Sequence, residues 1–122
     1  MALSLVAVDN DRVIGHIAAS PVSISDGTDG WYGIGPVSVT PEWQGRGIGS
    51  QLLRRAVAEL QGTGAAGCVL LGDPRCYARF GFRPEAALVL PDVPPEYFQA
   101  MSFCAVVPKG RVSYHEAFNA KN

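Results

Sequence analysis

The sequence predicts an α/β fold with a mixed, mostly antiparallel sheet and one central strand–helix–strand crossover. Three observations carry this prediction. Short runs of branched apolar residues, typical of strands, occupy the N-terminal third, and from Ile48 the apolar residues change to helical spacing. A further short apolar run at 68–71 follows the helical segment and suits a buried strand. Because a helix joins them, the strands before and after it are expected to be parallel neighbours in a right-handed crossover.

The N-terminal residues predict a β-hairpin. Residues 3–8 and 13–20 are apolar runs separated by the turn-forming sequence DNDR at 9–12. A polar, glycine-bearing loop is expected at 23–30. The next run, 32–39, is typical of a strand, but it contains two glycines and a proline. Such residues weaken regular pairing, so we expect a bulged or interrupted strand there.

Two helices are predicted after this strand. Ile48 opens an amphipathic helix that ends in the sequence GTGAAG. The sequence DPRCYARF places Pro74 in the first turn of a short helix, with Asp73 as its cap. The C-terminal third predicts two more strands, at 103–107 and 112–115. The apolar stripe of the long helix consists of Ile48, Leu52, Leu53, Ala56, Val57 and Leu60.

Length, composition and charge limit the class of protein. The 122 residues suit a single domain, expected to span 1–122. Apolar residues make up 48% and charged residues 17%, which is typical of a globular chain. The net charge of −1 argues against nucleic acid or anionic lipid as a partner. We see neither a membrane-spanning run nor a signal peptide, so we expect no membrane partner and a cytoplasmic location.

The three cysteines, Cys68, Cys76 and Cys104, are odd in number and widely spaced. They fit neither a disulfide framework nor a paired metal site. We therefore expect a reduced protein without a metal.

The sequence QGRGIG at 44–49 brings three glycines to the start of the long helix. A helix N-terminus has unpaired N–H groups and a partial positive charge, and glycine lets a ligand approach the backbone, so the turn suits a phosphate. A Walker-type loop is not matched, because Gly49 is followed by Ser50 without a lysine. The G-x-G-x-G spacing also differs from the dinucleotide fingerprint. A glycine turn selected only for tight packing remains the alternative.

Residues 44–49 match the Q/R-x-x-G-x-G/A signature of the GCN5-related N-acetyltransferase (GNAT) superfamily. Downstream, LLGDPRCYARFGFRP resembles the second hallmark of that superfamily, and with the closing YHEAF it resembles the YhbS-like subgroup of predicted N-acetyltransferases. The resemblance covers roughly residues 3–118 and implies the GNAT acyl-CoA N-acyltransferase fold. Members usually begin with a strand and two helices before the hairpin, so the resemblance also implies an N-terminally shortened domain.

The resemblance implies acetyl-CoA as the acyl donor. The backbone of Val37 and Val39 would pair with the pantetheine arm, and the Val39 N–H would polarise the thioester carbonyl. Asp73 stands where many relatives have an asparagine that binds pantetheine; its alternative role is to cap the short helix. The residues implied in cradling the pyrophosphate are Gln44, Gly45, Arg46, Gly47, Ile48, Gly49 and Ser50.

Tyr77 lies four residues before a Gly-Phe pair, where the resemblance implies a general acid that protonates the CoA thiolate. A covalent route through Cys76 is the less favoured alternative, since no histidine adjoins it in the sequence. The general base stays unassigned among Glu42, His16, His115 and water.

We therefore expect an acetyl-CoA-dependent N-acetyltransferase that moves an acetyl group to a primary amine on a small molecule or peptide. The mechanism implied is direct attack in a ternary complex. The alternatives are a non-catalytic acyl-CoA-binding or dimerisation module of the same fold and, less favoured, a nucleotide-binding domain. A homodimer is compatible with so short a chain and its sheet edges.

Overall fold

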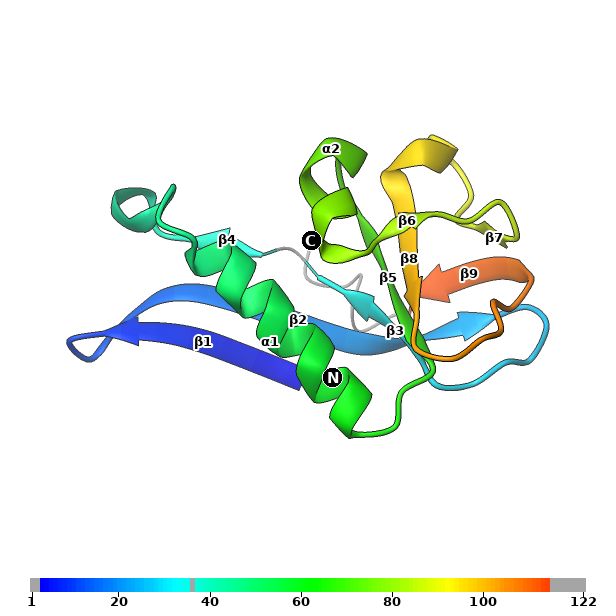
Figure 1. Ribbon diagram of the computed structural model, residues 1–122, viewed down its shortest axis with the longest axis horizontal. Helices are drawn as coiled ribbons and strands as arrows, with labels where there is room; N and C mark the ends of the chain where they lie inside the picture. The colour runs from blue at the N-terminus through cyan, green and yellow to red at the C-terminus, as the bar shows by residue number, and fades with distance from the viewer. Residues whose placement is uncertain (1–2, 36, 115–122) are drawn as a thin grey trace.

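The computed structural model describes residues 3–35 and 37–114, which form one mixed sheet with α1 packed across one face (Figure 1). The order of the sheet is β6-β8-β5-β3-β2-β9-β7, and β1 and β4 both pair with β2. Most pairs are antiparallel; β3 and β5 are parallel neighbours joined through α1, which confirms the predicted parallel pairing of these two strands. The strands are β1 (Leu3–Asp9), β2 (Arg12–Ile24), β3 (Trp31–Ile34), β4 (Ser38–Val39), β5 (Gly67–Leu71), β6 (Arg83–Pro84), β7 (Leu88–Val89), β8 (Phe98–Ser102) and β9 (Gly110–Tyr114).

The helical elements are short except for α1. No helix among the described residues is long and apolar enough to cross a membrane. They are η1 (Pro41–Trp43), α1 (Ile48–Gly62), α2 (Pro74–Tyr77), η2 (Ala78–Phe80) and η3 (Pro95–Tyr97).

The predicted hairpin is confirmed as β1 and β2. Asn10 and Asp11 form the turn with φ angles of 49° and 68°. Asparagine and aspartate tolerate this left-handed conformation better than other side chains, which explains why the turn falls there. The second strand is longer than predicted, since β2 continues through Ile24 into the segment expected to be a loop.

The predicted interruption of the third strand is also confirmed. Ile34 pairs with Ala19, whereas Ser38 pairs with His16, so the β3–β4 segment contains one more residue than β2 does over the same stretch. Such an extra residue is a β-bulge, which bends a strand and increases its twist. As a result β3 lies beside β5, but β4 pairs only with β2.

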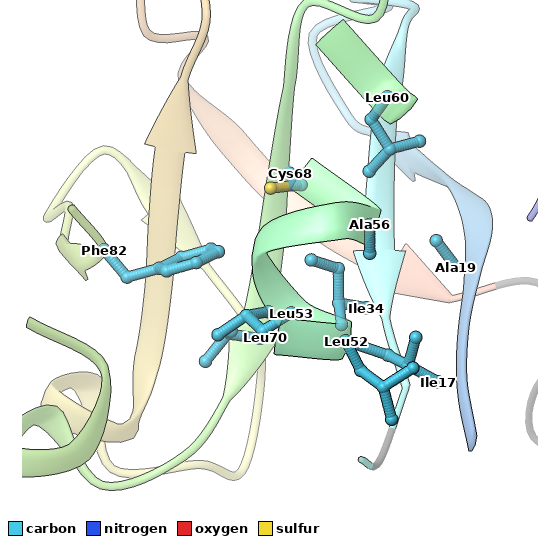
Figure 2. Close-up of a cluster of buried hydrophobic side chains, with 10 residues drawn as sticks. All are labelled: Ile17, Ala19, Ile34, Leu52, Leu53, Ala56, Leu60, Cys68, Leu70 and Phe82. Atoms are coloured by element: carbon cyan, nitrogen blue, oxygen red, sulfur yellow. The ribbon is translucent and has the colours of Figure 1, made fainter. Parts of the chain in front are cut away.

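The two faces of the sheet carry separate apolar clusters. Strand alternation directs Cys68 and Leu70 toward α1, while Val69 between them belongs to the opposite cluster. Figure 2 shows the first cluster, between α1 and the sheet. Its buried members are Ile17, Ala19, Ile34, Leu52, Leu53, Ala56, Leu60, Cys68, Leu70 and Phe82. The buried members of the second are Val22, Ile24, Trp31, Val69, Leu88, Phe98, Ala100 and Val112.

The strand predicted at 103–107 is wrong, because the observed strand is β8, which pairs with β5. The Ser102 hydroxyl donates to the Cys104 carbonyl at 2.7 Å and accepts the Cys104 N–H at 3.3 Å. These local bonds turn the chain just after the strand. The strand itself was hidden by the polar Gln99, which is fully buried within it. The last strand is β9, which ends at the last described residue; the predicted position His115 lies outside the described residues.

Candidate active site

The glycine turn before α1 presents unpaired backbone N–H groups. Gly45 and Gly47 have φ angles of 79° and 83°, a conformation that favours glycine. The first backbone hydrogen bond of the helix runs from the Gln51 N–H to the Gly47 carbonyl at 3.0 Å. Among the described residues, none accepts a hydrogen bond from the backbone N–H groups of 45–50. With the positive end of the helix dipole, these groups suit an anion.

A hollow of about 470 Å³ lies directly at this turn. Arg79, which follows α2 in the chain, reaches it and donates from Nη2 to the Ser50 Oγ at 3.1 Å. The same guanidinium lies 4.7 Å from the centre of the Phe80 ring. The turn therefore combines unpaired N–H groups with a fixed positive charge. The hollow is lined by Val39, Trp43, Gln44, Gly45, Gly47, Ile48, Gly49, Ser50 and Arg79.

Two further hollows continue from this one into the sheet. The second, of about 160 Å³, shares Gly49, Ser50 and Arg79 with the first. The third, of about 230 Å³, shares Val37 and Tyr77 with the second. Together they form a path from the helix N-terminus to the point where β3 and β5 separate, which we call the groove.

The walls of the groove come from the divergence of β4 and β5. Pairing between β3 and β5 ends at Gly33 and Val69. Beyond it, the Thr40 N–H donates to the Ile14 carbonyl at 2.8 Å, so β4 is held to β2. Backbone groups alternate in direction along a strand, so those of Val37 and Val39 point away from β2 and toward the groove.

The Gln44 side chain supports this arrangement. Its Nε2 donates to the Val39 carbonyl at 3.0 Å. This bond occupies one of the outward-facing backbone groups of β4 and joins the strand to the glycine turn. Gln44 therefore has two roles: its side chain holds β4 in place beside the glycine turn, and the residue also lines the first hollow.

Tyr77 lies where the second and third hollows meet. A Cβ on Gly72 would clash with the Tyr77 ring, so the ring rests directly on the Gly72 backbone. That backbone is itself held, because the Gly72 N–H donates to the Tyr97 carbonyl at 2.9 Å and Gln99 donates to the Gly72 carbonyl at 2.8 Å. The ring also packs edge-on against Phe82, with centroids 6.4 Å apart. The phenol is thus held at a defined place in the groove.

Two of the residues implied by the sequence lie apart from the groove lining. The Asp73 carboxylate accepts the Arg75 N–H at 2.8 Å and the Arg75 guanidinium at 2.7 Å, so it caps α2 as the alternative interpretation predicted. These bonds lower the pKa of Asp73, the Arg75 side chain having the largest effect. The Arg46 guanidinium stacks 4.9 Å from the Trp43 ring centre at the rim of the turn. Cys76, by contrast, does line the second hollow.

The candidate bases are not gathered at Tyr77. His16 lies on the hairpin with its Nε2 3.0 Å from the Ser4 hydroxyl. Glu42 is exposed on η1 and lines none of the three hollows, and His115 lies outside the described residues. No group of three or more potential metal ligands occurs within residues 3–35 and 37–114.

Tyr114 was missed by sequence reasoning. It ends β9 and lines the third hollow opposite Tyr77. Burial raises the pKa of the Tyr114 phenol to about 12, and the negative charge of the Cys68 thiolate is the smaller cause of the shift. The phenol therefore stays neutral at physiological pH. Arg79 was also missed, although the spacing of the sequence YARFGF placed it two residues after Tyr77.

Comparison with known proteins identifies the family. The sequence matches the family model described as an acetyltransferase (GNAT) domain over residues 2–84. The chain belongs to the GNAT acetyltransferase family. It is 35% identical over 126 residues to the Escherichia coli (strain K12) protein named uncharacterized N-acetyltransferase YhbS, covering 98% of this chain and 75% of that protein.

Two solved GNAT structures resemble this chain closely. A GNAT family acetyltransferase from Brucella melitensis, in complex with acetyl-CoA, is 50% identical with a TM-score of 0.82, covering 96% of this chain and 68% of that one. E. coli YhbS in complex with CoA is 36% identical with a TM-score of 0.89, covering 99% and 71%. These relatives confirm the resemblance and the GNAT fold expected from the sequence. Membership makes the protein an acetyltransferase of the acyl-CoA-dependent GNAT class.

Proposed function

We propose that this GNAT protein binds acetyl-CoA along the groove and transfers the acetyl group to a primary amine by direct attack in a ternary complex. The observation that carries the proposal is the continuity of the groove. It joins the unpaired N–H groups of the glycine turn to an open strand edge and then to Tyr77. These are an anion site, a peptide-like docking edge and a proton donor, in the order in which CoA carries its diphosphate, pantetheine amides and thioester.

The diphosphate belongs at the first hollow. The N–H groups of 45–50 bind its oxygens, and the Arg79 guanidinium adds a charge-assisted hydrogen bond. Arg46 lies at the rim, where its charge attracts the anion at longer range.

The pantetheine arm belongs along β4. Its amides pair with the outward-facing Val37 carbonyl and Val39 N–H, as an added strand would, and not with the Val39 carbonyl, which Gln44 occupies. We assign the thioester carbonyl to the Val37 N–H, and not to the Val39 N–H expected from the sequence. Val37 lines the hollow that contains Tyr77, whereas Val39 lines the hollow at the turn. Loss of one such donor costs about 2.7–4 kcal/mol in other enzymes.

The reaction follows from these positions. The neutral amine attacks the thioester carbon, a C–N bond forms, and the C–S bond breaks. Tyr77 gives its phenolic proton to the departing thiolate, the amine loses a proton to water leading to bulk solvent, and the tyrosinate takes a proton back from solvent before the next turnover. We assign no side-chain base, because Glu42 and His16 lie away from the groove lining. Three free cysteines suit a reducing compartment, so we place the reaction in the cytoplasm.

The test is a calorimetric titration of the chain with acetyl-CoA, desulfo-CoA and ATP. Saturable binding of both CoA compounds, with none for ATP, supports the site. A panel of primary amines with thiol detection of released CoA then tests transfer. Binding without CoA release would favour the alternative, a non-catalytic acyl-CoA-binding module. Equal binding of ATP would point to a general nucleotide site instead.

A further inference from the structure

The third hollow is bounded by two tyrosines on opposite faces of the sheet. Tyr77 packs with the cluster on the α1 face, and Tyr114 packs with the cluster on the other face. Both line the hollow of about 230 Å³. The first two hollows lie beside α1 and Tyr77, so a ligand that follows the groove enters from the Tyr77 side and ends at Tyr114.

The position of the Tyr114 ring is fixed by a glycine. Tyr114 belongs to β9, but β2 lies between β9 and β3 in the sheet. Its ring reaches over β2, since a Cβ on Gly33 of β3 would be 2.6 Å from the Tyr114 Cε2. The ring therefore lies against bare backbone and cannot move closer to β3.

Gly33 also marks the apex of the opening between the strands. It pairs with Val69, and the β3–β5 ladder ends at that pair. The Tyr114 ring consequently covers the closed end of the groove, where the space between the strands is narrowest.

We propose that Tyr114 sets the length of acyl group that the protein accepts, restricting it to short chains such as acetyl. This inference rests on the proposed function. The hollow is lined mainly by apolar groups, from Ile34, Val37, Leu70 and Leu71 besides the tyrosines. The Tyr114 ring stands at one end of this hollow of about 230 Å³. A chain that lengthens from the thioester along the hollow therefore approaches the ring, which limits its length.

The ring of Tyr114 forms the end wall of the hollow, and its hydroxyl is not needed for this role. Tyr114→Ala removes the wall. Tyr114→Phe keeps the wall, and Tyr97→Ala is a matched control, because Tyr97 is 46% exposed and lines none of the three hollows. Tyr114→Leu is a second shortened variant, for use if the alanine variant fails to fold.

The experiment is a titration of each protein with CoA, acetyl-CoA, butyryl-CoA and hexanoyl-CoA, with the thermal midpoint of every variant recorded. One methylene in a fitted apolar pocket changes affinity by roughly 10–200-fold. We expect the original protein to bind butyryl-CoA at least about tenfold more weakly than acetyl-CoA. Tyr114→Ala should reduce this ratio by about tenfold or more, while Tyr114→Phe and Tyr97→Ala should retain it.

Three results would overturn the inference. The first is equal binding of acetyl-CoA and butyryl-CoA by the original protein. The second is an unchanged ratio in a folded Tyr114→Ala or Tyr114→Leu variant that still binds CoA. The third, failure of the original protein to bind any CoA compound, would overturn the proposed function as well, and is distinguished by the CoA titration itself.

Discussion

The Arg79 guanidinium donates to the Ser50 hydroxyl at 3.1 Å and so joins the segment after β5 to the first turn of α1. Ser50 directly follows the first sequence motif and Arg79 belongs to the second, and they meet at the hollow beside the glycine turn. Their contact fixes a positive charge where backbone N–H groups already converge. The two motifs therefore form one anion site.

Replacing Arg79 with alanine should weaken CoA binding by about tenfold or more, because hydrogen bonds to charged groups are worth roughly 1.5–3 kcal/mol. The salt dependence of binding should fall as well, since one cation is lost. Calorimetry at two salt concentrations measures both. Arg55→Ala is the control: Arg55 lies on the exposed face of α1, paired with Glu59 at 3.3 Å. Equal losses in the two variants would contradict a specific role for Arg79.

Gly49→Ala separates ligand binding from folding. The φ of Gly49 is not positive, and its added Cβ would meet Val37 at 3.5 Å and Val39 at 3.8 Å, which are ordinary contacts. Stability should therefore hold or rise by up to about 1 kcal/mol, as alanine favours a helix over glycine. The methyl group nevertheless enters the groove, so CoA affinity should fall about tenfold or more.

The matched control for this prediction is Gly62→Ala at the other end of α1, where an added Cβ meets nothing within 4 Å. It should leave CoA binding unchanged. Thermal unfolding and calorimetry are the measurements. If Gly49→Ala binds CoA normally, the glycine is there for packing alone.

Tyr77→Phe should slow CoA release by about 100-fold or more at saturating substrates, which is the lower end of typical acid catalysis. The ring contacts with Gly72 and Phe82 need no hydroxyl, so the Kd for acetyl-CoA should change by less than about threefold. Turnover and binding are measured separately on the same preparation. An unchanged turnover number would remove the phenol from the mechanism.

The Tyr114 phenol should lose its proton at a higher pH than an ordinary tyrosine does. Its pKa is raised from 10.0 to about 12, chiefly by burial. The difference in tyrosinate absorbance between the original protein and Tyr114→Phe should therefore appear near pH 12. A step near pH 10 in that difference would show that the phenol is open to solvent.

The same shift affects stability. The unfolded chain loses the Tyr114 proton near pH 10 and the folded chain near pH 12, so the free energy of unfolding should decline as pH rises through this interval. Tyr114→Phe should reduce the decline without abolishing it, because burial also raises the pKa of Cys68 to about 12. Denaturant unfolding at pH 8 and pH 11 measures the difference.

Local signals explain what could be predicted from the sequence. Gly45, Gly47 and the helical spacing after Ile48 are neighbours in the chain, so the turn and the helix could be predicted together. The interrupted strand was likewise visible in its own glycines and proline. Tyr77 was placed by its distance from the Gly-Phe pair, and Asp73 by the proline after it.

The features that could not be predicted from the sequence depend on contacts between segments that are distant in the chain. Tyr114 reaches the groove because β9 pairs with β2, and no local pattern in β9 indicates that partner. Gln99 could not be recognised as a strand residue, since its burial depends on the bond from its amide to the Gly72 carbonyl. The hydrogen bond between Arg79 and Ser50 spans 29 positions. Such relationships require the sheet order, which the sequence left open.

The extra residue between Ile34 and Ser38 has a consequence for engineering. The side chains of Val37 and Val39 lie against α1, as that of Ile34 does. With one residue removed between Ile34 and Val37, these three side chains would fall on the same face of the sheet by regular strand alternation. A chain shortened by one residue here would keep these helix contacts, while the straightened strand could continue beside β5. We expect such a deletion to yield the same domain with the groove closed, and therefore without a CoA site. The difference in free energy of unfolding between the two proteins would then measure what it costs the sheet to keep β4 and β5 apart.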